Sequence, residues 1–156
     1  QFAKYTGNRE VLDFCRERYQ TVLLPGQMDT DGSFPLELAR TKPYGYSLFN
    51  LDAMATVCHI LSDDTNNLWQ YTTKDGRNMQ KGVAWLCPYI KDKSAWPFEK
   101  DVMYWDEWPV AHTALLFSVC DTPDEDYFSL WSELEHFPEN DEVIRNFPLR
   151  HPLLWL

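Results

Sequence analysis

The sequence predicts an all-α domain in which buried helices alternate with more amphipathic ones. Apolar residues recur at three- and four-residue spacing in several segments, which is the period of one helix face. Segment 47–61 is apolar around nearly its whole circumference, which indicates a helix covered on all sides. No alternating run of apolar and polar residues is long enough to predict a strand. The pattern is typical of a helical array or toroid, in which outer helices wrap inner ones.

The chain opens inside a predicted helix. Phe2 and Tyr5 lie three residues apart, on one helix face, and Gly7 is a C-terminal stop signal. Because a domain seldom begins in the middle of a helix, we expect residues 1–156 to be the C-terminal part of one larger domain.

Two long helices follow, and an extended loop separates them. Asn8 can cap the first helix, which is expected to end at Pro25. Ser47 can cap the second, over 47–61. The loop between them, 25–46, has about twenty residues, and loops of that length inside compact domains are usually functional. This loop is therefore the first candidate for a functional site.

The second half of the chain is expected to hold shorter helices and one irregular stretch. The predicted helices cover 64–72, 77–90, 109–120 and 123–136. Thr122 can cap the last of them, with Pro123 at its first position. The stretch 91–108 lacks helical periodicity and is predicted to be irregular.

Composition and charge restrict the classes of partner. Of the 156 residues, 44% are apolar and 15% are aromatic, which argues against a disordered chain. The formal net charge of −10 repels phosphate backbones and anionic lipid, so we expect neither nucleic acid nor a membrane as partner. An anionic small molecule or polysaccharide can still bind, because a local Arg and Lys pair in a desolvated cleft outweighs a distant, salt-screened charge.

Residue types that bind metals or carry redox chemistry show no ligand pattern. The cysteines are dispersed without a C-x-x-C pair, and the histidines lack H-x-x-x-H spacing. The run Asp29 to Gly32 lacks the ligand ladder of an EF-hand, so turn chemistry is the preferred interpretation. His59 and His112 fall in apolar helices and are expected to be hydrogen-bonded core residues. We therefore expect no metal and no cofactor.

The sharpest functional signal is Arg40 close to Tyr46. An arginine fork binds a carboxylate through two parallel hydrogen bonds. A tyrosine has an ordinary pKa of about 10, and one or two cations in a dry cleft can lower it until the phenol serves as general base and then as general acid. The alternative is structural: Arg40 pairs with Glu37, and Tyr46 packs at the start of the helix.

Further candidates surround this pair. Lys42 and Tyr44 either line a groove with it or are merely solvated. The aromatic residues between Trp85 and Trp108 can stack on sugar rings, because the apolar faces of sugars pack on aromatics. We expect only one or two of them to do so, and select Trp96 and Trp105 as substrate contacts.

The stretch GSFPLELARTKPYGYSLFNLDAM, residues 32–54, resembles a motif of the alginate lyase superfamily, polysaccharide lyases with an (α/α) toroid. Stretches around 88–97 and 150–155 also resemble the closing part of such a domain. The resemblance implies an incomplete barrel of helical hairpins and cleavage by β-elimination. In that reaction the uronate carboxylate is neutralised, a Tyr or His removes the C5 proton, and a Tyr protonates the departing oxygen. Position by position, Arg40 matches the carboxylate-binding arginine and Tyr46 the catalytic tyrosine.

Two features depart from the family pattern. Arg40 lies one residue closer to Tyr46 than the corresponding arginine of the better-studied alginate lyases does. The family's Asn-His pair, which helps to neutralise the carboxylate, precedes the part that resembles residues 1–8. We therefore expect the chain to be inactive alone and to need the N-terminal half of the domain as its partner. The resemblance and the acidic composition predict a periplasmic or secreted bacterial protein.

Three functions compete on these observations. A polysaccharide lyase would act on an acidic, uronate-containing polysaccharide through Tyr46. A non-catalytic sugar-binding protein would use the aromatic residues alone. A glycoside hydrolase on a similar toroid would use two carboxylates from Glu37, Asp52, Asp106 and Glu107.

Overall fold

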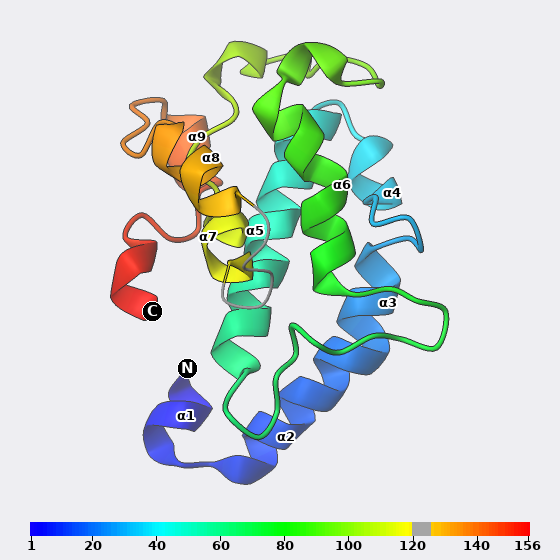
Figure 1. The fold of residues 1–156 in the computed structure, drawn as a ribbon, viewed down its shortest axis with the longest axis vertical. Coiled ribbons are helices and arrows are strands. Elements are labelled where there is room, and N and C mark those ends of the chain that lie inside the picture. The colour runs from blue at the N-terminus through cyan, green and yellow to red at the C-terminus, as the bar shows by residue number, and fades with distance from the viewer. Residues whose placement is uncertain (120–125) are drawn as a thin grey trace.

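The protein was studied as a computed structural model, which describes residues 1–119 and 126–156 (Figure 1). Within those ranges the regular secondary structure is helical. Strand-like pairing is limited to an isolated bridge between Asp63 and Asn66. The all-α prediction is therefore confirmed. The predicted cap at Thr122 and the first-turn Pro123 lie outside the described residues. Within the described ranges, no helix combines the length and apolar content needed to cross a bilayer.

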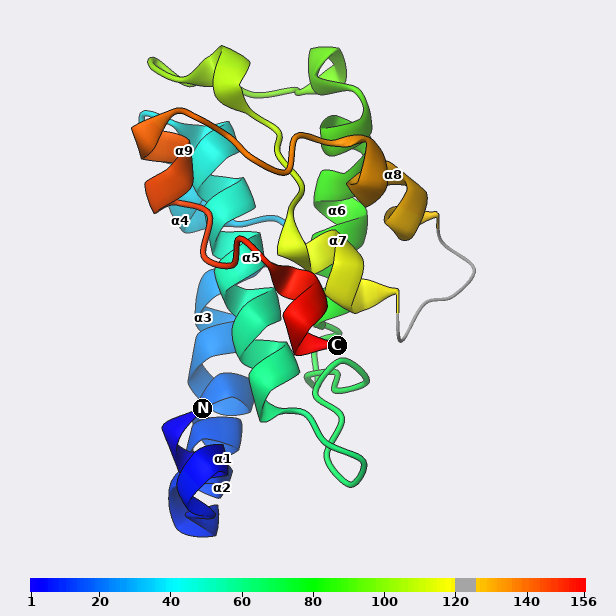
Figure 2. The same ribbon diagram turned by 90° about the vertical axis from the view of Figure 1, so that its left-hand side faces the viewer.

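The longest helix, α5, runs through the middle of the molecule with the other elements around it (Figures 1 and 2). The described α-helices are α1 (Phe2–Thr6), α2 (Arg9–Arg18), α3 (Leu24–Gln27), α4 (Pro35–Leu38), α5 (Pro43–Leu61), α6 (Met79–Lys91), α7 (Thr113–Ser118), α8 (Tyr127–Glu133) and α9 (Asp141–Arg145). A π-helical segment, η1 (Tyr19–Leu23), joins α2 to α3. Shorter 3-10 turns are η2 (Lys93–Ala95), η3 (Trp105–Glu107) and η4 (Pro152–Trp155).

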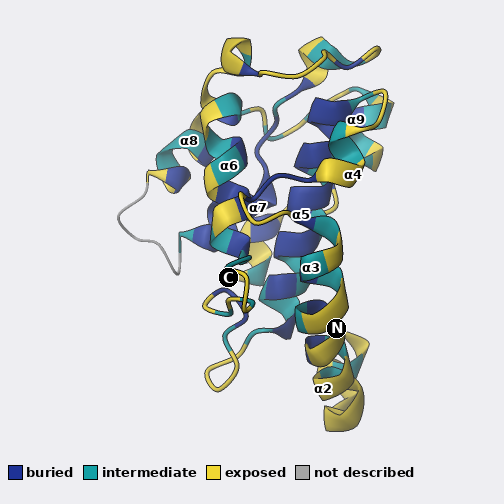
Figure 3. Ribbon diagram, turned by 90° about the vertical axis from the view of Figure 1, so that its right-hand side faces the viewer, coloured by how far each residue is buried: buried dark blue, intermediate teal, exposed yellow. Residues whose placement is uncertain are grey.

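Helix α5 is buried along most of its length, as its sequence predicts (Figure 3). It packs against α4, α6 and α7. Leu48 and Leu51 have no exposed surface, and complete burial of a leucine side chain stabilises a fold by roughly 1.5–3 kcal/mol. Near the other end of the helix, Nε2 of His59 lies 2.8 Å from the carbonyl oxygen of Trp155, which holds η4 beside α5 (Figure 2).

The start of α5 differs from the prediction. The helix begins at Pro43, one turn before the predicted cap at Ser47. The carboxylate of Asp101 accepts hydrogen bonds from the backbone N–H groups of Tyr44 and Gly45, both at 2.8 Å. It caps the helix from a distant part of the chain and places a negative charge at the positive end of the helix dipole. Ser47 lies at the start of the second turn, where its hydroxyl donates to the carbonyl of Pro43 at 2.6 Å.

At Gly45, α5 lies directly against the irregular stretch after α6. A Cβ atom on Gly45 would lie 2.7 Å from Nε1 of Trp108 and 2.8 Å from Oδ2 of Asp101. We expect Gly45→Ala to lower the free energy of unfolding by about 1–2 kcal/mol, because the clash outweighs the better helix propensity of alanine. Urea denaturation followed by circular dichroism measures this loss. Gly26→Ala in α3 is the matched control, since a Cβ there meets nothing within 4 Å, and an equal loss in both variants would contradict the prediction.

From α1 to α3, the predicted signals for where helices start and end are correct, with one exception at Pro25. Gly7 follows α1 in left-handed backbone (φ 66°), and the side chain of Asn8 caps α2. Pro25 does not end the helix, which continues through η1 into α3. Directly before Pro25, the N–H of Leu24 donates to the carbonyl of Tyr19 in a widened π turn. Such a turn accommodates a proline, which has no N–H to donate.

The predictions for the second half are mixed. Helix 77–90 corresponds to α6, 109–120 to the shorter α7, and the described part of 123–136 contains α8. The predicted helix 64–72 is wrong. Oδ1 of Asp63 accepts the N–H groups of Thr65 and Asn66, each at 2.9 Å, and such side-chain bonds compete with a helix.

Candidate active site

The predicted pair, Arg40 and Tyr46, lies at the N-terminal end of α5. Arg40 follows α4, and Tyr46 belongs to the first turn of α5. The irregular stretch after α6 is attached here by the hydrogen bond from the N–H of Val102 to the carbonyl of Thr41, at 3.1 Å. Helix α9 approaches the same end from the C-terminal part of the chain (Figure 1). Three segments that are distant in sequence therefore form the site.

Two cations contact the ring of Tyr46, which is half-buried. The guanidinium carbon of Arg40 lies 4.3 Å from the ring centroid, and the ammonium nitrogen of Lys42 lies 4.8 Å from it. Cations at these distances are attracted to the face of an aromatic ring. The structure thus brings Arg40, Lys42 and Tyr46 together.

The structural alternative for Arg40 is present as well. Nη1 of Arg40 lies 3.6 Å from Oε2 of Glu37, while 54% of the Arg40 side chain is exposed. That distance is too long for a hydrogen bond, so the donors of the guanidinium remain available to a ligand carboxylate. Burial raises the pKa of Glu37, and the nearby Arg40 opposes that rise.

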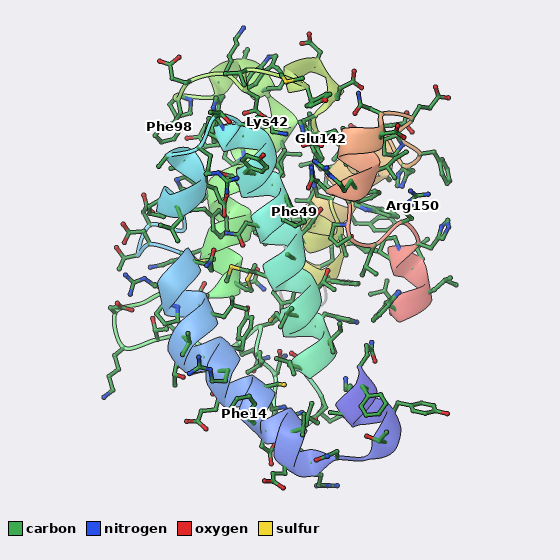
Figure 4. All side chains as sticks on the ribbon, turned by 180° about the vertical axis from the view of Figure 1, so that it is seen from behind. Phe14, Lys42, Phe49, Phe98, Glu142 and Arg150 are labelled. Carbon is green, nitrogen blue, oxygen red and sulfur yellow. The ribbon has the colours of Figure 1, made fainter. Side chains whose placement is uncertain are left out.

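Lys42 is an ion-paired side chain and not a solvated one. Its ammonium donates to Oε1 of Glu142 in α9, and Figure 4 shows the two side chains side by side. The ammonium also lies 5.1 Å from the ring centroid of Tyr104. Burial opposes the charge of Lys42, but hydrogen bonds to Glu142 and to Tyr46 outweigh it and raise the pKa of Lys42 above its ordinary value.

The predicted substrate contact at Tyr44 is not supported by its position. Its side chain is fully buried, and its hydroxyl donates to the carbonyl of Tyr89 at 2.9 Å. Burial raises the pKa of Tyr44 above its ordinary value. Residues two apart on a helix point in different directions, so Tyr46 and Tyr44 cannot face the same groove. Tyr44 therefore packs the start of α5 from inside.

Trp96 is also largely removed from solvent, with 8% of its surface exposed. Its indole N–H donates to the carbonyl of Glu99 at 3.1 Å. Its ring meets the rings of Tyr44 and Tyr89 edge-on, at centroid distances of 5.0 and 5.3 Å. Such edge-to-face packing stabilises a core, so the structure does not support the expected sugar contact at Trp96.

Trp105 keeps part of its ring accessible. It is half-buried, and its ring centroid lies 5.3 Å from that of Tyr44. The ammonium groups of Lys93 and Lys100 lie 4.9 and 5.5 Å from the Trp105 ring. Lys93 also donates to the carbonyls of Trp105 and Trp108, each at 2.9 Å. Of the two selected tryptophans, Trp105 is the one that a ligand can reach.

Sequence reasoning missed Asp101, Tyr104 and Glu142. Asp101 and Tyr104 lie in an irregular stretch without periodicity, and Tyr104 adopts left-handed backbone (φ 64°), which its residue type does not suggest. Glu142 lies in the first turn of α9, a helix that was not predicted. One local signal could have found α9: Asn140 is a strong N-cap residue, and its side chain accepts the N–H of Glu142 at 2.9 Å.

A second titratable pair, Asp52 and His112, lies in the core. Oδ2 of Asp52 lies 2.8 Å from Nδ1 of His112, and both side chains are 1% exposed. Oδ1 of Asp52 accepts the N–H of Ala114 at 2.9 Å. The prediction of a hydrogen-bonded core histidine is confirmed for His112, whereas His59 is only half-buried. Asp52 is too deeply buried to belong to a glycosidase pair.

The acidic run after α3 forms a turn, as predicted. Oδ1 of Asp31 accepts the N–H of Ser33 at 2.8 Å, and Oδ1 of Asp29 accepts the N–H of Thr30 at 2.6 Å. The hydrogen bonds to Ser33 lower the pKa of Asp31. These carboxylates therefore stabilise the turn by accepting hydrogen bonds from its backbone.

Comparison with known proteins identifies the family. The sequence profile of the alginate lyase family matches residues 1–96. The crystal structure of an alginate lyase from Bacteroides ovatus is similar to this chain, with a TM-score of 0.67 and 30% sequence identity. The match covers 94% of this chain and 38% of that chain, so the helices described above correspond to part of an (α/α) toroid. No curated protein sequence matches this chain. The profile covers more than half of the sequence, and the chain therefore belongs to the alginate lyase family.

Proposed function

We propose that the protein containing this chain is a polysaccharide lyase that cleaves an acidic, uronate-containing polysaccharide by β-elimination. The observation that carries the proposal is the placement of Arg40 and Lys42 against the ring of Tyr46. This arrangement can hold a sugar carboxylate beside a phenol that transfers protons. Membership of the alginate lyase family supports the same reaction class.

The proposed reaction uses Arg40 and Tyr46 in different steps. The Arg40 guanidinium binds the uronate carboxylate through paired hydrogen bonds, which neutralises its charge and acidifies the proton on C5. Tyr46 acts as a phenolate and removes that proton, with Arg40 and Lys42 beside its ring. The electron pair left on C5 forms a double bond to C4 as the C4–O bond breaks. The Tyr46 hydroxyl then returns the proton to the departing glycosidic oxygen.

We further propose that the N-terminal half of the domain is needed to complete the groove. This chain spans 38% of the length of the Bacteroides ovatus alginate lyase that it matches. The exposed guanidinium of Arg40 would face the groove that both halves form. Because a large acidic polymer does not cross a membrane, we propose a periplasmic or secreted location for the protein.

The test is an assay of the longest natural polypeptide that contains these residues. It is incubated with polymannuronate, polyguluronate and a glycosaminoglycan, with neutral amylose as the control. We expect ultraviolet absorbance from the unsaturated product with at least one uronate polymer and none with amylose. Saturated products without absorbance would indicate a hydrolase, and binding in calorimetry without any product would indicate a sugar-binding protein.

A further inference from the structure

The two cations beside Tyr46 differ in how firmly they are held. The Arg40 side chain is 54% exposed and has one distant ionic contact, with Glu37. The Lys42 side chain is 14% exposed and pairs with Glu142, whose side chain is 10% exposed. A lysine is a point charge on a flexible stem, so its position depends on its anchor. The anchor of Lys42 comes from a helix about a hundred positions later in the chain.

Contacts on several sides confine the Lys42 ammonium. It donates to the Glu142 carboxylate and lies 4.8 and 5.1 Å from the ring centroids of Tyr46 and Tyr104. An interaction with the Tyr46 side chain also contributes to the raised pKa of Lys42. A sugar carboxylate would have to compete with Glu142 for this cation.

Glu142 is itself fixed. Asn140 accepts the N–H groups of Glu142 and Val143, at 2.9 and 3.4 Å, and Val143 is completely buried. The side-chain amide of Asn146 donates to the Glu142 carbonyl at 3.0 Å. The Glu142 carboxylate also pairs with Arg145, and its charged partners lower the pKa of Glu142, Lys42 most of all. The carboxylate is therefore ionised and held in place by a short, well-capped helix.

We propose that Glu142 is a positioning residue that fixes the Lys42 ammonium against Tyr46. In this arrangement Lys42 supports proton transfer by Tyr46, while Arg40 binds the sugar carboxylate. This inference rests on the proposed lyase function of the same site. Glu142 lies outside residues 1–96, which the family profile matches. The C-terminal part of the chain thereby contributes to the chemistry of a motif that begins near residue 32.

The first test needs no activity. Ring currents of Tyr46 and Tyr104 displace the proton resonances of the Lys42 ε-methylene upfield, and Lys42→Met identifies those resonances by their loss. In Glu142→Gln we expect them to return to the position of exposed lysines. Asp141→Asn removes the same charge from the same turn of α9, where Asp141 is exposed, and should leave them displaced. Resonances that stay displaced in Glu142→Gln would overturn the proposal, whether or not the protein is a lyase.

A second variant, Glu142→Asp, tests whether the effect of Glu142→Gln comes from loss of the carboxylate or from a disturbed fold. Glu142→Asp keeps the carboxylate but shortens its reach, so we expect a displacement between those of the native protein and Glu142→Gln. If Glu142→Gln does not fold, as judged by circular dichroism, Glu142→Asp takes its place in the comparison with Asp141→Asn. A Glu142→Asp spectrum identical to the native one would then count against the proposal.

The kinetic test uses the active polypeptide. We expect Glu142→Gln to lower kcat about tenfold and to leave KM within about twofold, as Lys42→Met does, because both remove the cation from Tyr46. The double variant should be no slower than Lys42→Met alone, since both changes act on one interaction. Arg40→Ala should instead raise KM. A Glu142→Gln enzyme with native kcat, or one altered only in KM, would overturn the proposal.

Discussion

Replacing Tyr46 with phenylalanine is expected to lower kcat of the lyase by roughly 10²–10⁴-fold, the range for loss of a general acid–base group. The substitution removes only the hydroxyl. It keeps the ring that contacts the Arg40 guanidinium and the Lys42 ammonium. The groove and its carboxylate-binding cation therefore stay in place, and KM should change little. Initial rates of ultraviolet absorbance, measured over a range of substrate concentrations, give both constants.

The control for this variant is Tyr71→Phe. Tyr71 belongs to the segment that joins the C-terminal end of α5 to α6, whereas Tyr46 lies at the N-terminal end of α5, so loss of the Tyr71 hydroxyl should leave the rate unchanged. The helical circular dichroism of both variants should equal that of the native protein. A Tyr46→Phe enzyme with native kcat would show that another group moves the proton.

The largest expected effect on stability comes from Asp52→Ala. Asp52 bridges α5 to His112 and to the N–H of Ala114 in α7, and all these groups are buried. Removing the carboxylate leaves Nδ1 of His112 and the N–H of Ala114 without their partner in a site that water does not reach. We expect the free energy of unfolding to fall by about 3–5 kcal/mol, the usual cost of breaking a buried pair. Urea denaturation followed by tryptophan fluorescence measures this loss.

The matched control is Asp64→Ala, which removes the same side chain from an exposed position in the turn after α5. Its effect should stay within about 0.5 kcal/mol, as for most surface substitutions. If Asp52→Ala were as mild as Asp64→Ala, the buried bridge could not be a main link between α5 and α7.

Local sequence patterns were sufficient to predict helices that are defined by apolar periodicity or by a neighbouring cap residue. The apolar circumference of 47–61 identified the central helix, and Asn8 identified the start of α2. The start of α5 could not be predicted, because its cap is Asp101, which the chain brings back from far along the sequence. The predicted helix at 64–72 failed because the side chain of Asp63 offers the backbone a competing set of hydrogen bonds.

The candidate site likewise has a part that a local motif predicts and a part that depends on tertiary packing. Arg40, Lys42 and Tyr46 lie within seven consecutive residues, so a sequence motif can bring them together. Glu142 joins them only through an ion pair with Lys42 that spans a hundred positions of the chain, which no local pattern expresses. Burial also depends on packing. An aromatic residue such as Trp96 can face a groove or a core, and composition does not distinguish the two.

The carboxylate of Asp101 also makes the start of α5 dependent on a segment that forms only short 3-10 turns, η2 and η3. If that segment opened transiently, two amide groups would lose their acceptor, and the first turn carrying Tyr46 would be freed to unwind. Opening of this kind is local, and it requires much less free energy than melting of the core. If the protein is the proposed lyase, its activity would be lost on warming before the helical content falls, and the first turn of α5 would set the temperature limit of catalysis.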